Sequence, residues 1–540
     1  MDTRDSRYGQ LAALRHPVEE QVTLYHDGGL VETLPPPGAP ATDARNLALF
    51  AVAQHPEPQN ALLVGRALGH LPRELAALKL QRLEAVELDP ALFDLARDCG
   101  TPPAEGLPIV RFFADGRRHV QRASVPYHVV VLQLPPPLSA FVNRFYTVEF
   151  FREVRRAMAE DGVLITSVMA AANYPGETVG QLSASILRTL QEVFPEVLVA
   201  PGETHTFVAG TRPGLVSLDP AVLARRIAAR GIWLPDADPD FRDDAEAYYT
   251  ARFENLVITS QVAGLRQTLD ATPAPVNTDA RPIVYQYALL VWNQIVSADT
   301  QARDPGLRGG TNALFRAALR LRFGHGLVVP ALLVLPALVL AVVGRLRRRG
   351  RGALGPAYGI LATAFATGLF GMAAEIILLY AFQAVNGYAY AQVGLIVASF
   401  MVGLALGARA GTRWERRTGF LALVVGAMAV YCVLLPLALR GLAAAGAAVW
   451  GLLAVPFFVL VFVAGFLDGA TFPALVGSMR GLGFQRPGAW VYAADLTGAG
   501  LGALATGALL VPVLGNALAL GLVAAILAAA LAALLPALRA

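Results

Sequence analysis

Apolar runs of about 20 residues fill the sequence from residue 323 to its end, and this feature constrains the fold more than any other. A helix of about 20 apolar residues is long enough to cross roughly 30 Å of hydrocarbon. Seven runs have this character: 323–344, 356–382, 388–408, 419–439, 449–474, 490–514 and 516–538. The sequence therefore predicts a helical membrane domain over residues 311–540 with about seven transmembrane helices. Its first partner would be the lipid bilayer.

Charged residues are shared very unequally between this region and the rest of the chain. Only 16% of all residues are charged, whereas about a quarter are charged in an ordinary soluble domain. Residues 311–540 contain four acidic residues and sixteen arginines, and residues 1–310 contain the other 36 acidic and 28 basic residues. The arginines lie beside apolar runs, where membrane topology explains them, so nucleic acid is not an expected partner.

The motifs of several enzyme classes are absent. Lys79 is the only lysine and does not lie in a phosphate-binding glycine loop. Cys99 and Cys432 lie in different regions, so they predict neither a disulfide framework nor a zinc site. The eight histidines form no H-E-x-x-H motif, and no G-x-S-x-G motif occurs. We expect no bound metal.

Arginines between the apolar runs predict the orientation of the spans. The RLRRRGR link (345–351), the links after the third and fifth runs and the C-terminus are rich in arginine, whereas the alternate links contain only Arg440. Arginine-rich links are typically cytoplasmic. With seven spans the N-terminal region would then lie outside, although the sequence shows no export signal. Either a preceding membrane segment is missing from this chain, or the first run does not cross. A separately encoded multi-span membrane half would be a further partner. We therefore predict a multi-pass protein of the cell membrane and leave the side of the soluble domain open.

Three acidic residues lie within the predicted spans: Glu375, Asp468 and Asp495. An ionisable group in hydrocarbon usually faces the bundle interior or a cavity. They indicate either a proton or substrate path, or neutral acids bonded to neighbouring helices. For Asp468, close to the end of its predicted span, the second interpretation is favoured. Gly403 with Gly407, and Gly498 with Gly502, have the spacing that lets helices approach closely.

Residues 21–215 alternate between strand and helix patterns. A hairpin over 21–34 turns at Asp27-Gly28-Gly29, and predicted strands follow at 60–65, 82–89, 108–116, 127–134 and 162–169 with helices between them. This order predicts an α/β Rossmann-like domain with a parallel sheet covered on both faces. We place domain boundaries at 1–45 for a small N-terminal β element, 46–215 for the Rossmann domain and 216–310 for a helical extension and linker.

Small and acidic residues follow the first three strands of this sheet. They are Gly65 to Gly69, then Glu87 with Asp89, then Asp115-Gly116. Ligands of such sheets bind at the carboxyl ends of the strands. Glycines allow a ligand to approach the backbone, and acids there can accept hydrogen bonds from ribose hydroxyls and an adenine amino group. The pattern predicts a nucleoside site, with helix capping as the alternative role for each acid.

Residues 5 to about 215 resemble the spermidine synthase (aminopropyltransferase) family, and specifically a bacterial branch fused to major-facilitator-like helices. The resemblance rests on DSRYGQ, LYHDGGLVETLP, AQHPEPQNALLVG, LEAVELDPALFDLAR, ADGRRHV, NRFYTVEFFREVRRAMAEDGVL and NTDARPIVYQYALLVW. Residues 403–417 partly resemble a loop of a major-facilitator half, through Gly407, Gly411, Arg416 and Arg417. The resemblance implies a spermidine-synthase/methyltransferase-type fold. It also implies that decarboxylated S-adenosylmethionine, methylthioadenosine or a related adenosyl compound is a ligand.

The chain departs from the family at several site positions. The family's Gly-Gly-Gly-Asp-Gly-Gly loop is Gly65-Arg66-Ala67-Leu68-Gly69-His70 here, and Gln133 stands where the resemblance implies a catalytic aspartate. Pro136 replaces an acid that helps to hold the diamine, and the Tyr-His-Glu element falls on Ala48-Leu49-Phe50. Glu87, Asp115 and Tyr146 are retained.

Two functions follow from these departures. The first is a membrane protein whose synthase-like domain has lost catalysis and serves a binding, regulatory or transport-related role. The second is an active, membrane-anchored polyamine aminopropyltransferase or related transferase of adenosyl compounds. Gln133 and the altered glycine loop favour the first, because glutamine cannot take a proton at neutral pH.

Overall fold

The computed structural model describes residues 2–16, 18–36, 41–100, 106–170, 176–234, 243–292, 354–387, 390–414, 418–445 and 454–534. The chain divides into two compact units. One comprises Met1–Thr278 and Tyr287–Trp292, and the other comprises Asp279–Gln286 and Asn293–Ala540. Each unit is described by itself.

A four-stranded antiparallel sheet opens the first unit. Its strands are β1 (Asp2–Ser6), β2 (Gly9–Arg15), β3 (Val22–His26) and β4 (Gly29–Leu34), in that order across the sheet. The predicted hairpin over 21–34 is confirmed, and it turns at Asp27 and Gly28, whose φ angles are 49° and 75°. Positive φ at both central residues suits a two-residue hairpin. The first hairpin, β1–β2, was not expected, because β1 is polar throughout, although β2 contributes the buried Leu11 and Ala13.

A seven-stranded sheet follows, with the order β10-β11-β9-β8-β5-β6-β7. The strands are β5 (Asn60–Val64), β6 (Arg82–Glu87), β7 (Ile109–Phe113), β8 (Tyr127–Leu132), β9 (Met158–Met169), β10 (Glu196–Ala200) and β11 (Thr204–Gly210). Strands β5 to β9 are parallel, and β11 is antiparallel to both of its neighbours. This confirms a Rossmann-like fold of the methyltransferase type. The five expected strands are present, and β10 and β11 were missed.

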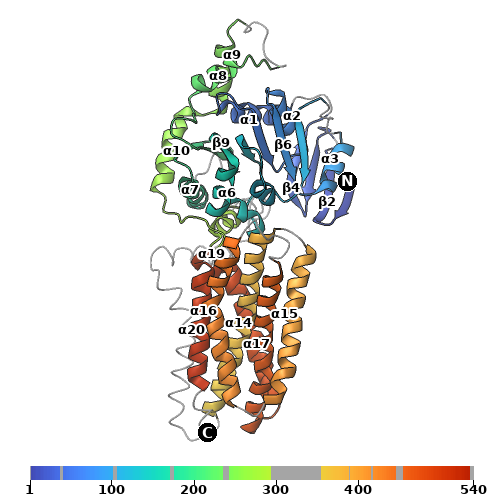
Figure 1. The fold of residues 1–540 in the computed structure, drawn as a ribbon, viewed down its shortest axis with the longest axis vertical. Helices are drawn as coiled ribbons and strands as arrows, with labels where there is room; N and C mark the ends of the chain where they lie inside the picture. The colour runs from blue at the N-terminus through green and yellow to red at the C-terminus, as the bar shows by residue number, and fades with distance from the viewer. Residues whose placement is uncertain are drawn as a thin grey trace. The chain divides into compact units, whose positions relative to one another are not determined.

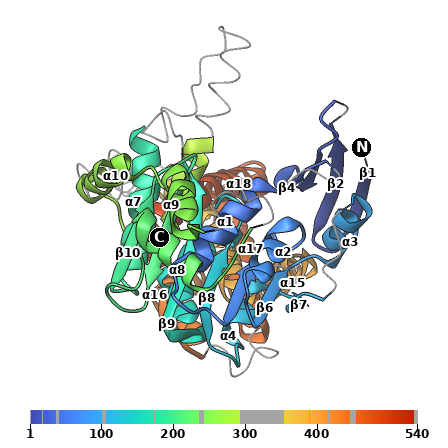
Figure 2. The same cartoon turned by 90° about the horizontal axis from the view of Figure 1, so that it is seen from above.

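Helices cover both faces of the sheet, as Figures 1 and 2 show. Helix α1 packs against α2 and α8, whereas α4 packs against α6 and α6 against α7. The bounds are α1 (Thr42–Ala53), α2 (His70–Ala77), α3 (Pro90–Asp98), α4 (Gly116–Gln121), α5 (Ala140–Asn143), α6 (Val148–Ala157), α7 (Glu177–Gln191), α8 (Pro220–Ala229), α9 (Ala245–Leu256) and α10 (Thr259–Ala271).

The small N-terminal sheet packs on the Rossmann domain at one edge. Its inward residues Leu11, Leu24 and Leu34 form a buried cluster with Leu92 and Leu95 of α3 and with Leu68 of the glycine loop. Alone, the inner face of the N-terminal sheet and the facing side of α3 would each expose apolar area. Their mutual burial therefore stabilises both the small sheet and the Rossmann domain. The packing brings β4 against the segment that connects β5 to α2.

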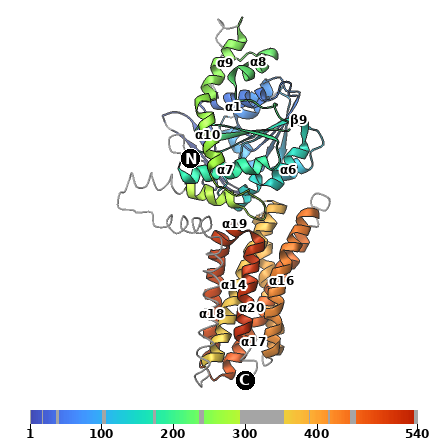
Figure 3. The ribbon, with the colours of Figure 1, turned by 90° about the vertical axis from the view of Figure 1, so that its left-hand side faces the viewer.

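The second unit is a bundle of long apolar helices (Figure 3). Among the described residues, six helices are long and apolar enough to cross a membrane: Pro356–Asn386, Gln392–Gly411, Gly419–Leu442, Ala454–Gly481, Pro487–Leu514 and Asn516–Leu534. The helices are α14 (Leu354–Asn386), α15 (Tyr390–Gly411), α16 (Thr418–Ala445), α17 (Ala454–Gly481), α18 (Pro487–Ala505), α19 (Val511–Leu514) and α20 (Asn516–Leu534). These correspond to six of the seven predicted runs. The first run, 323–344, and the RLRRRGR link lie outside the described residues.

Glycines set the closest helix contacts in this unit. A Cβ on Gly403 or Gly407 of α15 would overlap the carbonyl oxygen of Phe462 or Phe466 of α17, and Gly469 of α17 meets Leu404 in the same way. On α18, a Cβ added to Gly498 would overlap the carbonyl oxygen of Phe365 on α14. Backbones this close are possible only where no side chain intervenes. The predicted packing roles of the two glycine pairs are therefore confirmed.

Candidate functional site

The glycine loop begins where β5 ends. Gly65 has φ of 78°, and a Cβ there would collide with the carbonyl oxygen of Gln133. Only glycine fits both conditions. Arg66 follows with φ of 46°, also in the left-handed region. The loop ends at Gly69, which precedes α2. The structure thus places Gly65 and Gly69 at the carboxyl end of β5, beside the end of β8, as the sequence predicted.

Glu87 is the last residue of β6, the neighbour of β5. Its Oε1 accepts a hydrogen bond of 2.8 Å from Leu88 N–H, and the N–H groups of Ala67 and Asp89 also donate to it. Burial raises the pKa of Glu87 to about 7, although these N–H groups oppose the rise. Ala67 belongs to the glycine loop, so the loop and the predicted ribose-binding acid lie in direct contact.

Two of the strand-end acids cap helices. Asp89 Oδ1 accepts from Ala91 N–H at 2.9 Å at the start of α3. Asp115 Oδ1 accepts from Arg118 N–H at 3.1 Å at the start of α4. Asp115 Oδ2 is buried, and no hydrogen bond to it is found among the described residues. Asp115 therefore caps α4 through Oδ1. Next to it, a Cβ on Gly116 would overlap Val64 of β5.

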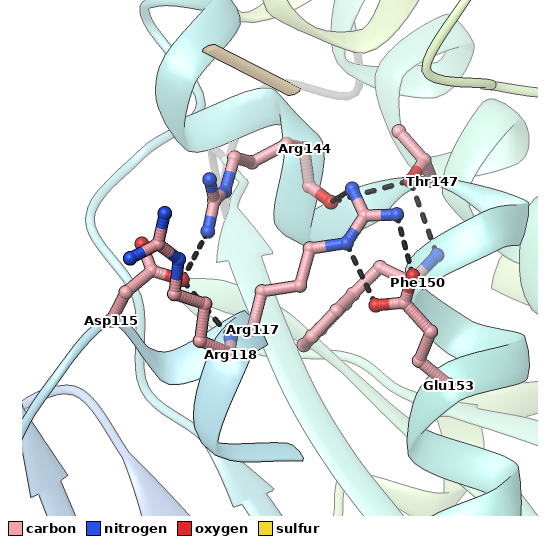
Figure 4. Close-up of polar contacts among 7 residues, drawn as sticks. All are labelled: Asp115, Arg117, Arg118, Arg144, Thr147, Phe150 and Glu153. Atoms are coloured by element: carbon pink, nitrogen blue, oxygen red, sulfur yellow. Dashed lines mark hydrogen bonds and ion pairs between the residues drawn. The ribbon is translucent and has the colours of Figure 1, made fainter. Parts of the chain in front are cut away.

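Arg144 forms an ion pair with Asp115 that the sequence reasoning missed (Figure 4). The exposed fractions of the two side chains are 1% for Arg144 and 8% for Asp115. Beside it, Arg117 pairs with Glu153 at 2.7 Å and donates to the carbonyl oxygen of Arg144 at 3.3 Å. The only sequence signal for this network was an arginine beside aromatic residues in NRFYTVEF. The network fixes the segment after β8 against the end of β7.

Gln133 and Tyr146 meet at Ser167, a residue of β9. Gln133 Nε2 donates to Ser167 Oγ at 3.2 Å, and Tyr146 OH donates to the Ser167 carbonyl oxygen at 3.5 Å. Burial raises the pKa of Tyr146 above its usual value. Asn277 Nδ2 donates to Tyr146 O at 2.9 Å. The position that the family resemblance assigned to a proton acceptor is thus filled by a neutral amide and a neutral phenol.

Glu32 reaches the glycine loop from β4, which the sequence reasoning also missed. Its side chain is 3% exposed, and a Cβ on Gly69 would overlap its carboxylate. Burial raises the pKa of Glu32 to about 7, with Arg66 acting in the opposite direction and Glu87 adding to the rise. The sequence signal that could have revealed Glu32 was the alternation of inward and outward residues along β4. Glu32 lies on the same face of β4 as the buried Leu34, where a charged residue is unusual.

The three acids of the predicted spans lie in the second unit. Asp468 of α17 contacts Gly371 of α14, and Asp495 of α18 contacts Gly368 of the same helix. Glu375 lies one helical turn beyond Gly371 and is 8% exposed. Asp468 lies near the middle of α17, which corrects the placement near a span end, because the helix continues through Pro473 to Gly481.

The comparisons with known proteins agree with this geometry. Residues 43–208 match the family model of the spermine/spermidine synthase domain. This part of the chain is a spermine/spermidine synthase domain. A polyamine aminopropyltransferase of Moorella thermoacetica is 30% identical over 169 residues, which are 29% of this chain and 58% of that protein. One of Pyrobaculum calidifontis is 28% identical over 200 residues, or 34% and 67% of the two chains.

A spermidine synthase solved with the transition-state analogue AdoDATO has 17% identity and a TM-score of 0.36, and covers 48% of this chain and 88% of that one. Human methyltransferase-like protein 13, solved with SAH, has 20% identity and a TM-score of 0.28, with 37% and 95% covered. The chain spans 58% and 67% of the two curated relatives. The spermine/spermidine synthase domain ends well before α14, so the six apolar helices lie beyond it.

Several residues at which the sequence predicts a departure from the family pattern are buried in the apolar core. Ala48, Leu49 and Phe50 are buried in α1, where they contribute to the apolar core. Leu68, the fourth residue of the glycine loop, is also fully buried. That these residues replace polar groups of the family stays a prediction from the resemblance. The roles of Glu87, Asp115 and Tyr146 in ligand binding remain predictions.

Proposed function

We propose that this chain is a multi-pass protein of the cell membrane whose spermine/spermidine synthase domain binds an adenosyl compound but does not transfer an aminopropyl group to a diamine. The observation that carries the proposal is Gln133, whose amide donates to Ser167 Oγ at 3.2 Å. The domain would then serve a binding, regulatory or transport-related role for the helices that follow it.

The loss of catalysis rests on proton transfer. An amine nucleophile arrives protonated at neutral pH, and a positioned carboxylate is needed to remove the proton. Gln133 has no basic group. Tyr146 cannot replace it, because burial raises the pKa of its phenol. Loss of a general base typically lowers the rate by about 10²- to 10⁴-fold.

Diamine binding is weakened by the same set of changes. A diamine is a dication and needs carboxylates to replace its water. Pro136 stands at one position where the family resemblance implies an acid, and its carbonyl oxygen accepts from Leu138 N–H at 2.7 Å within the loop. Ala48, Leu49 and Phe50 are buried at another. Neither position offers a charge to a dication.

In contrast, the acidic groups that would bind a nucleoside are present. Glu87 lies at the end of β6, and the buried Oδ2 of Asp115 has no hydrogen bond among the described residues. A buried acceptor without a partner is costly, so a donor such as an adenine amino group would stabilise it. Decarboxylated S-adenosylmethionine, methylthioadenosine and related adenosyl compounds all carry this group.

Membrane insertion is supported by the six apolar helices and their glycine contacts. The bilayer is then the first partner, and a separately encoded multi-span membrane half would be the second. The acids Glu375, Asp468 and Asp495 converge around α14, and a transport-related role would use them as a proton or substrate path. The side on which the synthase domain lies is open.

The alternative function, an active membrane-anchored aminopropyltransferase, is favoured by one observation. Glu32 brings a carboxylate to the glycine loop, and burial raises its pKa to about 7, close to the ideal for a general base at neutral pH. The curated relatives are themselves named polyamine aminopropyltransferases. Under this alternative, turnover is present and Glu32→Gln abolishes it.

Calorimetry with methylthioadenosine on the full chain in detergent tests the binding half of the proposal. We expect measurable binding that Glu87→Ala abolishes, whereas Asp94→Ala, which removes an exposed acid of α3, leaves it unchanged. Binding that survives both Glu87→Ala and Asp115→Ala would show that these acids only cap structure. Absence of heat at millimolar ligand would refute the binding role.

A further inference from the structure

Two charged side chains at the glycine loop are incompletely satisfied. Arg66 Nη2 lies 3.8 Å from Glu32 Oε1, which is too long for a hydrogen bond. Arg66 Nε and Glu32 Oε2 are both buried, and neither has a hydrogen bond among the described residues. Buried polar atoms of charged groups are almost always paired in native proteins. The pair therefore has one donor and one acceptor to offer to a ligand.

The position of the pair places it beside the non-nucleoside end of an adenosyl ligand. Arg66 follows Gly65, which contacts the carbonyl oxygen of Gln133, and Glu32 contacts Gly69. If Glu87 binds the ribose, the group attached to the ribose 5′ carbon extends from Glu87 towards Gln133. Arg66 lies on the loop that follows β5, the strand between β6 and β8, and Glu32 reaches the same loop from β4.

We propose that Arg66 and Glu32 together bind the α-amino acid group of a carboxylated adenosyl compound, such as S-adenosylmethionine or S-adenosylhomocysteine. This inference rests on the proposed adenosyl site and names its ligand class. A guanidinium pairs with a carboxylate, and a carboxylate accepts from an ammonium group. An α-amino acid presents both charges on one carbon, in the complementary arrangement.

Decarboxylated ligands fit this arrangement less well. Such a ligand offers an ammonium to Glu32 but leaves Arg66 without an anion, and its positive charge lies near the guanidinium. Gln133 is neutral, so it adds no carboxylate for the amine. Leu68, at the loop position where the family pattern has aspartate, is apolar and buried. The charge balance of the loop therefore selects a carboxylate-bearing tail.

The test compares three thioethers, none of which carries a sulfonium charge. They are S-adenosylhomocysteine, its decarboxylated form S-adenosyl-3-thiopropylamine, and methylthioadenosine, each titrated by calorimetry into the full chain in detergent. We expect S-adenosylhomocysteine to bind at least tenfold more tightly than the decarboxylated form. Arg66→Ala should remove this preference and leave methylthioadenosine affinity within twofold. The matched control is Arg97→Ala, which removes an exposed arginine of α3 and should change neither affinity.

Proton release gives a second readout. Binding of an ammonium favours the ionised form of Glu32, so S-adenosylhomocysteine should release protons at pH 6.5, seen as a dependence of the heat on the buffer. Methylthioadenosine should release none through this group, and Glu32→Gln should abolish the release.

Equal affinities for the carboxylated and decarboxylated thioethers would overturn the inference while leaving adenosyl binding intact. So would an equal loss of methylthioadenosine binding in Arg66→Ala, since that would assign Arg66 a structural role. Failure of all three compounds to bind would refute the adenosyl site and this inference together.

Discussion

Gln133 donates a hydrogen bond from its side-chain Nε2 to Ser167 Oγ, with 3.2 Å between the two atoms. The bond joins the end of β8 to β9, the neighbouring strand, at the point where the family resemblance implies a catalytic aspartate. The side chain is 9% exposed, so the amide is held in place. Gln133 thus forms a structural hydrogen bond and carries no carboxylate, and several consequences of the proposed account can be measured.

Removing the carboxylate of Asp115 should destabilise the synthase domain strongly. The Arg144 side chain is 1% exposed, and a buried charge that loses its counter-ion costs roughly 3–5 kcal/mol. We expect Asp115→Ala to lower the first thermal transition of the full chain in detergent by about 10 °C. The control Asp98→Ala breaks an exposed pair with Arg4 and should shift the transition far less, because water screens exposed pairs. Equal shifts of the transition in Asp115→Ala and Asp98→Ala would contradict the assignment of a buried ion pair between Arg144 and Asp115.

The stability of the domain should fall with rising pH because of Glu32. Burial raises the pKa of Glu32 from 4.5 to about 7, so the folded chain binds more protons than the unfolded chain between these values. Stability contributed by the protonated form is present below pH 4.5 and is lost as the pH rises to about 7. Glu32→Gln should therefore be more stable than the wild type at pH 8, by up to about 3 kcal/mol, and equal to it near pH 4.5. A difference that is the same at both pH values would rule out this titration as the cause.

How much of this could be read from the sequence differs between the two units. The sequence predicted α14 to α20 from apolar runs long enough to cross a bilayer. It predicted β5 to β9 from the alternation of strand and helix patterns. Glu32 was not assigned to the site, because its approach to Gly69 depends on how the N-terminal sheet packs against α3. The Arg144–Asp115 pair was missed for the same reason, since 29 residues separate the partners. Strands β10 and β11 follow the last predicted strand and were missed, although Pro201-Gly202 between them is a turn signal.

Replacing Gly407 should disrupt the helix bundle. Its α carbon faces the carbonyl oxygen of Phe466 on α17 with no room for a side chain. Overpacking a close contact typically costs about 1–3 kcal/mol. We expect Gly407→Val to reduce the monodisperse fraction in size-exclusion chromatography and the thermal stability of the bundle. Gly426→Val on α16, where a Cβ would meet nothing within 4 Å, is the matched control. Similar behaviour of both variants would contradict the close α15–α17 packing.

The orientation of the membrane unit stays a prediction from the arginine-rich links. A reporter fused at residue 348, within RLRRRGR, should be active only in the cytoplasm. Activity restricted to the external compartment would reverse the topology. Protease protection of the synthase domain in intact cells, with and without a co-expressed upstream membrane segment, then decides which side that domain occupies.

The most direct test of the central claim is an aminopropyltransferase assay on the full chain in detergent, with putrescine and decarboxylated S-adenosylmethionine and with methylthioadenosine formation as the readout. We predict no turnover above background. We also predict that Gln133→Asp alone does not restore it, because Pro136 and Arg66 remain in the site. Wild-type turnover near about 1 s⁻¹, the lower end of ordinary enzyme rates, would contradict the account and establish the membrane-anchored transferase instead.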